Sequence, residues 1–387
     1  MEQPEGFIDE RYPHKVLRLN KSLYGLKQAP RIWYLLLCSV ITSLGFVALE
    51  SDPSIYYNQQ SQVIIAVYVD DILVLAKNEK LSLEVFNGLA QHFKVENKGL
   101  PTTFLGLNII RTPDTLSINQ SGYIERMLTR FNMTNASIAN SPMDPSLPLL
   151  KAQPNDRAVN ITEYQELVGS LNHGAVFTRP DISCSVSQLS QFLTKPTSTH
   201  MAAAKRVLRY LKGTKNLGII YRAKNHPSSR LDIIGFSDAN WAGDKNDRKS
   251  TTGYVFVIAS GPVSWTSHKQ STIALSTMEA EYMALSDASR EAIARFHLLE
   301  ELQLKVRTPL LASDNQGALT IAENPTNYQR AKHIDLRYHF IRHALERGQV
   351  QIEYVPTSHQ AADILTKALG PQKHQHAVGM VGLFNVY

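Results

Sequence analysis

Hydrophobic positions along the chain fall into short runs that predict strands and into longer periodic runs that predict helices. The clearest strand is predicted over residues 231–238. Its apolar body consists of Ile233, Ile234 and Phe236, and polar residues follow it. We expect Asp238 to lie exposed at the end of this strand. A carboxylate held there could bind a metal ion, but a strand often ends in an ordinary aspartate.

After residue 231 the pattern predicts three strands in succession, followed by helices that alternate with strands. This order indicates a mixed sheet flanked by helices, within a multidomain chain of the α/β and α+β classes. The further predicted strands are 253–258, 263–267, 310–313 and 350–355, and the predicted helices are 277–302, 334–347 and 360–369.

Four acidic residues of this region fall where strands end or helices begin. Such positions can converge on one side of a sheet, where a cluster of carboxylates needs cations or protons to neutralise it. Two glutamates, Glu279 and Glu281, are alternative candidates for this cluster. Helical spacing puts Glu281 at the margin of the apolar stripe and turns Glu279 to solvent, so Glu281 is the better candidate. Both glutamates, and the acidic residue at 363, could instead only stabilise a helix N-terminus. The four candidates are Asp238, Glu281, Asp314 and Asp363.

In the first 150 residues, two apolar runs within 63–76 flank Asp70 and Asp71. They predict a β-hairpin with the acidic pair at its tip. The pair could be a plain acidic turn or could hold a hard cation such as Mg²⁺. Upstream, Gly25 allows a tight backbone path, and Lys27 could meet phosphate or remain a solvated surface charge.

The bulk composition favours an intracellular protein with a polyanionic partner. The 387 residues suit two or three domains, and the net charge of +6 favours nucleic acid over a neutral small substrate. Two cysteines, Cys38 and Cys184, exclude a disulfide framework or a zinc ribbon. The N-terminus has no signal-peptide pattern. Residues 32–49 carry no charge, but Pro30 before them favours a buried helix over a membrane span.

The most uneven charge distribution lies in residues 182–231, which contain nine Lys and Arg and no Asp or Glu. Lys205, Arg209 and Lys212 are three to four residues apart and therefore share one helix face. A cluster of one sign favours contact with phosphates over a plain solvated surface.

The motif YVDD at 68–71, preceded by SLYGLKQAPRIWY, resembles the reverse transcriptase of copia-type LTR retrotransposons. The resemblance implies that Asp70 and Asp71, next to Tyr68, bind metal, and that the segment with Gly25 and Lys27 positions nucleotide and template. Residues 104–109 resemble the segment that holds the primer end. Such polymerases need a third carboxylate upstream of SLYGLKQAP, so we expect a truncated domain without independent polymerase activity.

Four motifs resemble the ribonuclease H of the same family: SDANWAGD, STMEAEYMAL, ASDNQGAL and YVPTSHQAADILTKAL, in this order. The resemblance implies that the four acidic candidates bind two Mg²⁺ ions, which Mn²⁺ could replace, and cut the RNA strand of RNA–DNA hybrids. Lys332 could lie near the hybrid. His359 could assist product release or be an ordinary loop histidine.

We therefore expect a truncated reverse-transcriptase palm, a thumb-like segment, a basic connection, a ribonuclease H-like domain and a C-terminal tail. Expected partners are the RNA–DNA hybrid, RNA and DNA backbones and other products of the polyprotein, with no membrane, in the cytoplasm within virus-like particles or in the nucleus. The rival hypotheses are a catalytically dead or domesticated copy that only binds nucleic acid, and a gene model that is cut short. The expected domains are 1–115, 116–150, 151–230, 231–370 and 371–387.

Overall fold

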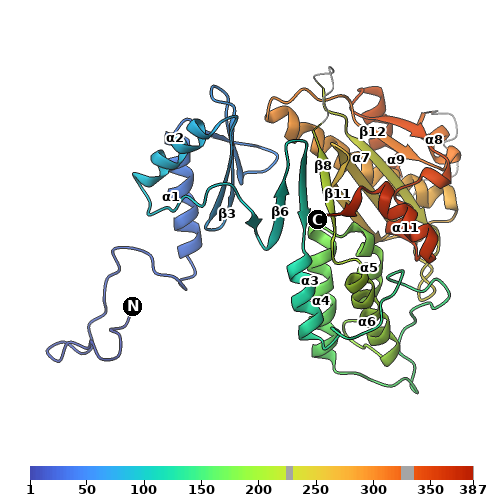
Figure 1. The fold of residues 1–387 in the computed structure, drawn as a ribbon, viewed down its shortest axis with the longest axis horizontal. Helices are drawn as coiled ribbons and strands as arrows, with labels where there is room; N and C mark the ends of the chain where they lie inside the picture. The colour runs from blue at the N-terminus through green and yellow to red at the C-terminus, as the bar shows by residue number, and fades with distance from the viewer. Residues whose placement is uncertain (224–229, 324–334, 387) are drawn as a thin grey trace. The chain divides into compact units, whose positions relative to one another are not determined.

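The computed structural model describes residues 1–223, 230–323 and 335–386 (Figure 1). The chain divides into two compact units, Met1–Gly99 and Leu100–Tyr387. Over these residues the fold is mixed α/β with three sheets, one in the first unit and two in the second. This confirms the predicted fold class.

The first unit packs two helices against a four-stranded antiparallel sheet of order β1-β2-β3-β4. Helix α1 starts with Pro30 in its first turn and buries Leu37, Val40 and Ile41. Among the described helices, none is long and apolar enough to cross a membrane. The elements are α1 (Ala29–Ser43), α2 (Glu79–Ala90), β1 (Val47–Ala48), β2 (Ile55–Asn58), β3 (Val63–Tyr68) and β4 (Asp71–Leu75).

The second unit begins with an antiparallel sheet of order β14-β8-β7-β6-β5. Its edge strand β14 comes from the C-terminal segment, so residues 371–386, expected to be a tail, form a helix and a paired strand. The strands are β5 (Thr103–Phe104), β6 (Leu107–Arg111), β7 (Thr115–Asn119), β8 (Leu217–Arg222) and β14 (Leu383–Asn385), and the helix is α11 (Pro371–Met380).

A helical layer with its own core lies beside this sheet. Tyr164, Leu171, Leu189 and Leu208 are fully buried in it. Helix α4 is followed by a short 3-10 turn, η1, which directly precedes α5. Helix α6 ends at Gly213. The elements are α3 (Ser121–Arg130), α4 (Ile161–Phe177), η1 (Pro180–Ile182), α5 (Ser183–Ser190) and α6 (Ser198–Gly213).

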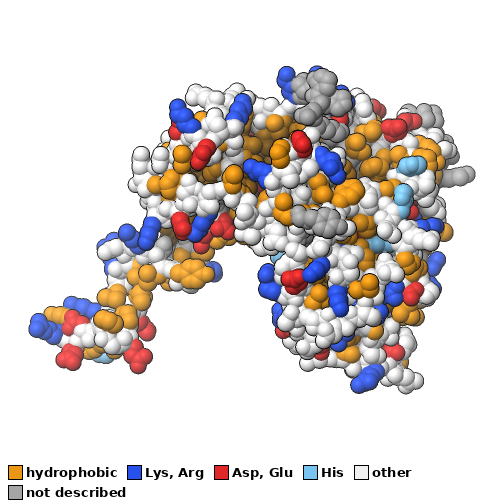
Figure 2. Space-filling model, in the orientation of Figure 1, with side chains coloured by type: hydrophobic (Ala, Val, Ile, Leu, Met, Phe, Trp, Pro, Cys, Tyr) orange, Lys and Arg blue, Asp and Glu red, His pale blue; other side chains and the backbone are white. Residues whose placement is uncertain are grey.

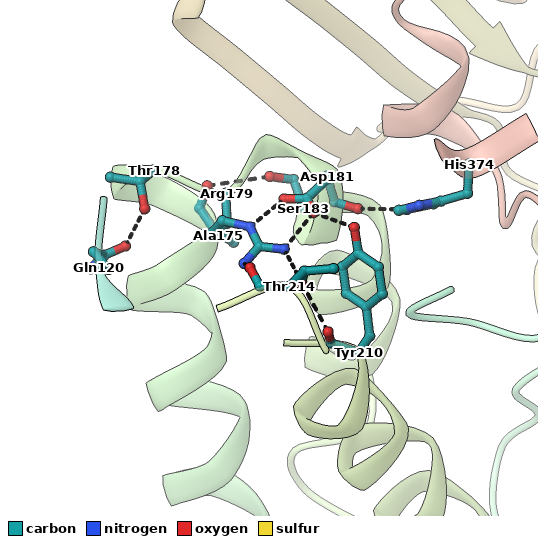
Figure 3. Close-up of polar contacts among 9 residues, drawn as sticks. All are labelled: Gln120, Ala175, Thr178, Arg179, Asp181, Ser183, Tyr210, Thr214 and His374. Carbon is teal, nitrogen blue, oxygen red and sulfur yellow. Dashed lines mark hydrogen bonds and ion pairs between the residues drawn. The ribbon is translucent and has the colours of Figure 1, made fainter. Parts of the chain in front are cut away.

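A buried ion pair ties these helices together (Figure 3). Arg179 and Asp181 are each 1% exposed and form a bidentate pair with N–O distances of 2.9 and 2.7 Å. The Tyr210 hydroxyl on α6 donates to the same carboxylate at 2.6 Å, and His374 on α11 lies 3.2 Å from the Asp181 backbone oxygen. Burial alone would raise the pKa of Asp181, but Arg179 and Tyr210 hold that pKa below its ordinary value. A buried charge pair persists only with such complete hydrogen bonding.

The third sheet has the order β11-β10-β9-β12-β13. Strands β9, β10 and β11 are antiparallel, whereas β12 is parallel to both β9 and β13. This is the mixed sheet that the sequence predicts. The strands are β9 (Ile234–Asn240), β10 (Thr251–Ile258), β11 (Gly261–Lys269), β12 (Leu310–Ser313) and β13 (Gln351–Tyr354).

Helices cover both faces of this sheet. Phe256 points to a core shared with α7, α8 and α9, while its neighbour Val255 points to a core shared with α10 and α11. Strand β9 begins at Ile234 rather than Leu231, and β10 and β11 each begin two residues earlier than expected. The helix expected over 360–369 is the short α10, which follows a 3-10 turn. The elements are α7 (Thr277–Glu301), α8 (Gln316–Glu323), α9 (Asp335–Glu346), η4 (Thr357–His359) and α10 (Asp363–Thr366).

Candidate active site

Three acidic side chains meet at one edge of the third sheet. Asp238 comes from β9, Glu281 from α7, and Asp314 follows β12; each offers a ligand atom within 4.8 Å of the other two. The parallel register of β12 and β9 explains why two of these residues are close. Ala312 lies opposite Phe236. Asp314 and Asp238 each come two residues later in the chain and therefore lie side by side. We call these three residues the carboxylate cluster.

Asp238 is buried, which corrects the expectation of an exposed strand end. It is 3% exposed because β9 continues to Asn240 and α10 packs against it. Its partner on β10 is Gly253, where a Cβ would lie 2.7 Å from Leu365 Cβ and Thr366 Cγ2. The glycine thus permits close approach of α10, and the Thr366 hydroxyl donates a hydrogen bond to Asp238 Oδ2.

Glu281 is the most perturbed group of the carboxylate cluster. It is 5% exposed, and no described residue donates a hydrogen bond to its Oε2. Burial, with repulsion from Asp238 and Asp314, raises the pKa of Glu281 to about 10, although the Ala239 backbone acts in the opposite direction. A buried, unpaired carboxylate oxygen beside two others calls for a proton or a cation. Carboxylate oxygens are the ligands that Mg²⁺ prefers, so the cluster fits a hard divalent cation.

Glu279 does not point to solvent as the helical spacing suggested. It is 7% exposed, and its Oε2 accepts the Leu275 N–H at 2.7 Å. Its own N–H donates to the Ser276 hydroxyl oxygen at 3.1 Å. Ser276 is therefore the N-cap of α7, and Glu279 stabilises the same helix start by accepting the Leu275 N–H, which is the plain structural explanation that the sequence had left open.

Asp363 lies in the first turn of α10, as expected, but it is not part of the carboxylate cluster. Burial and the nearby Asp238 raise the pKa of Asp363 to about 6, while Lys367 lowers it. Lys367 Nζ lies 2.7 Å from Asp363 Oδ1 and 3.8 Å from Asp238 Oδ2. Lys367 was not among the predicted site residues, although its position four residues after Asp363 is a visible signal in the sequence.

Two further candidates lie around this site. His359 is exposed in η4, with its Nδ1 3.1 Å from the Ser358 hydroxyl. In the same turn, the Thr357 hydroxyl donates to Asp314 Oδ2 at 2.7 Å and so orients that carboxylate. Lys332 lies outside the described residues.

The acidic hairpin of the first unit has the predicted form. Tyr68 pairs with Asp71 at the end of the β3–β4 ladder, and Asp70 lies in the connecting turn. All three side chains are exposed. The Trp33 indole N–H donates to the Val69 carbonyl at 3.2 Å, which ties α1 to the turn.

The upstream segment is also exposed. Gly25 has a φ of 94°, which confirms the tight backbone path, and Lys27 is exposed. Within the first unit, the described residues include no group of three potential metal ligands. The hairpin therefore presents two carboxylates to solvent.

The basic residues of α6 make contacts within the protein. Arg209 Nε donates to the Ser137 carbonyl at 2.8 Å, and Lys212 Nζ donates to the Ala136 carbonyl at 2.7 Å. Lys205 Nζ lies 4.0 Å from Glu163. Figure 2 shows basic side chains among acidic and apolar ones over α3, α4 and α6 on the face drawn. These contacts support a structural role in holding the preceding loop, and phosphate binding by this helix stays a prediction.

Comparison with known proteins agrees with the motifs. The family described as reverse transcriptase (RNA-dependent DNA polymerase) matches residues 1–145. The Pol polyprotein of transposon RE1 from Arabidopsis thaliana is 41% identical over 389 residues, which covers 100% of this chain and 26% of that protein. A transposon Ty5-1 protein of Saccharomyces cerevisiae is 34% identical over 295 residues, covering 75% of this chain and 94% of that protein.

Among solved structures, LC11 ribonuclease H1 in complex with an RNA/DNA hybrid is 18% identical, with a TM-score of 0.27, covering 35% of this chain and 94% of that one. The chain spans about a quarter of the length of the RE1 polyprotein. The identity to that polyprotein extends over both units, and the reverse-transcriptase match covers the YVDD hairpin. The chain belongs to the Pol polyproteins of copia-type retrotransposons.

Proposed function

We propose that residues 231–370 are a ribonuclease H that uses divalent cations to cleave the RNA strand of RNA–DNA hybrids. The observation that carries the proposal is the convergence of Asp238, Glu281 and Asp314, with Glu281 Oε2 buried and without a hydrogen-bond donor among the described residues. The four ribonuclease H-like motifs supply these residues in the expected order.

The residues of the carboxylate cluster would hold the cations, with Asp363 as a fourth ligand at its edge. Bound Mg²⁺ would stabilise charge on the scissile phosphate and lower the pKa of a water nucleophile. The surrounding hydroxyls hold the ligands in place: Thr366 donates to Asp238, and Thr357 donates to Asp314. Such outer contacts fix the orientation of metal-binding carboxylates.

Protons and cations would compete for the carboxylate cluster. Because burial and repulsion raise the pKa of Glu281 to about 10, proton release from Glu281 accompanies cation binding at neutral pH. Cation affinity is therefore expected to increase with pH.

For the first unit, the family match supports a reverse-transcriptase role. We propose that Asp70 and Asp71 are metal ligands of the polymerase site, that Tyr68 contacts nucleic acid beside them, and that Gly25 and Lys27 belong to the segment that positions nucleotide and template. The exposed hairpin tip is consistent with that role.

The test is cleavage of a labelled RNA–DNA hybrid by the full chain in Mg²⁺, with an RNA duplex and a DNA duplex as matched controls. The expected result is cutting of the RNA strand of the hybrid alone, which EDTA abolishes. The Glu281→Gln variant should bind the hybrid without cutting it. Binding of the hybrid by the parent chain without cleavage, in either Mg²⁺ or Mn²⁺, would instead establish the binding-only hypothesis.

A further inference from the structure

Lys367 places a positive charge between two acidic residues of the proposed metal centre. It follows α10 directly, and its ammonium nitrogen lies 2.7 Å from Asp363 Oδ1 and 3.8 Å from Asp238 Oδ2. The Lys367 side chain is 37% exposed, whereas those of Asp238 and Asp363 are 4% and 16% exposed. The ammonium group therefore reaches two largely buried carboxylates from the partly solvated edge of the site.

The local charges make this contact favourable. Asp238, Asp363 and Asp314 all act on Lys367 to raise its pKa, against the effect of burial. Close carboxylates repel one another, and an ammonium group between them relieves part of that repulsion. The lysine is held by charge, while its flexible four-carbon stem and partial exposure allow it to turn out to solvent.

We propose that Lys367 is a positioning residue that competes with one divalent cation for Asp238 and Asp363. This inference rests on the proposed metal-dependent function. An ammonium group and a metal ion are both attracted to carboxylate oxygens, and two positive charges beside the same carboxylates repel one another, so each weakens the binding of the other. Lys367 keeps the two carboxylates oriented toward the site, and it leaves as the cation binds.

Two opposite consequences follow for a variant without the charge. Cation binding should become tighter, because no ammonium group has to be displaced. A charge at this distance changes proton affinity by roughly tenfold or more, and a divalent cation should respond at least as strongly. Without cations, the same variant should be less stable, because Asp238 and Asp363 then repel one another with less compensation.

The test is titration of the full chain with Mn²⁺ in the absence of nucleic acid, with the free ion measured by electron paramagnetic resonance. Lys367→Gln and Lys367→Met should each bind Mn²⁺ about tenfold more tightly than the parent. Lys367→Arg, which keeps the charge, should stay close to the parent. The matched control is Lys373→Gln, which removes an exposed lysine from the start of α11 and should not alter the affinity.

Thermal melting of the same variants provides the second measurement. In EDTA, Lys367→Gln should melt below the parent, and saturating Mn²⁺ should narrow or reverse that difference. Unchanged or weaker Mn²⁺ binding by both folded uncharged variants would overturn the role of Lys367 while leaving the metal centre intact. Absence of saturable Mn²⁺ binding by the parent would overturn the metal centre, and this inference with it.

Discussion

Replacing Glu281 by Gln is expected to remove a pH dependence from the stability of the second unit in EDTA. Burial and the neighbouring carboxylates raise the pKa of Glu281 from 4.5 to about 10 in the folded protein. Between these values the folded protein keeps a proton that the unfolded chain releases. Because the folded state binds more protons, stability decreases as the pH rises through this window. Gln cannot titrate, so the variant loses this contribution.

The magnitude follows from the proton difference. One retained proton changes the free energy of unfolding by about 1.4 kcal/mol per pH unit, or roughly 3 kcal/mol between pH 7 and pH 9. This window lies above the pKa of Asp363, which is about 6. The window also lies above the ordinary histidine pKa of 6.5, and burial lowers the pKa values of His200 and His374 further. Over this range Glu281 should therefore dominate the difference between parent and variant in the pH dependence of the free energy of unfolding.

Urea denaturation followed by tryptophan fluorescence measures this difference. Trp33 belongs to the first unit, so a Trp33→Phe background leaves Trp241 and Trp265 as reporters of the second. Glu279→Gln is the matched control on the same helix and should keep the slope of the parent, because Glu281 remains. Parallel pH dependences of the parent and Glu281→Gln between pH 7 and pH 9 would refute the assignment of a buried, protonated Glu281.

Three further expectations concern single contacts. Tyr210→Phe removes a hydrogen bond from the buried Asp181 carboxylate and should cost about 1–3 kcal/mol in urea denaturation; no loss would contradict the buried network. Gly253→Ala brings a Cβ to 2.7 Å from Leu365 Cβ, so it should destabilise by about 1–3 kcal/mol and lower hybrid cleavage more than hybrid binding. Lys212→Ala frees a loop carbonyl and should speed amide hydrogen exchange of residues 134–140 with unchanged hybrid affinity; a reduced salt dependence of binding would instead show phosphate contact.

The sequence predicts well those features that depend on local pattern. The strand Leu310–Ser313 and the acidic hairpin emerge from short apolar runs with polar ends, and the structure confirms both. The position of Asp314 directly after its strand follows from the same pattern. These features need only the alternation of side chains along one segment.

Features set by contacts distant in sequence were not predictable in this way. The burial of Asp238 depends on α10, which reaches the strand only because Gly253 leaves room for it. Glu279 is buried because the turn before α7 folds back to place the Leu275 N–H on its carboxylate. The pairing of Arg179 with Asp181 is local, but the contact of His374, from the C-terminal helix, with the Asp181 backbone oxygen joins residues 193 positions apart. The periodicity of hydrophobic residues along the sequence does not reveal contacts between segments that are distant in sequence.

The most direct test of the metal-dependent nuclease is the single-turnover rate of RNA–DNA hybrid cleavage in Mg²⁺ by the parent and by Asp238→Asn. Loss of a metal-binding carboxylate should remove several kcal/mol of transition-state stabilisation, so the rate should fall by about a hundredfold or more. The matched control is Glu353→Gln, which neutralises an exposed carboxylate on β13 of the same sheet and should keep the parental rate. Equal rates for the parent and Asp238→Asn would contradict the assignment of the carboxylate cluster as the catalytic centre.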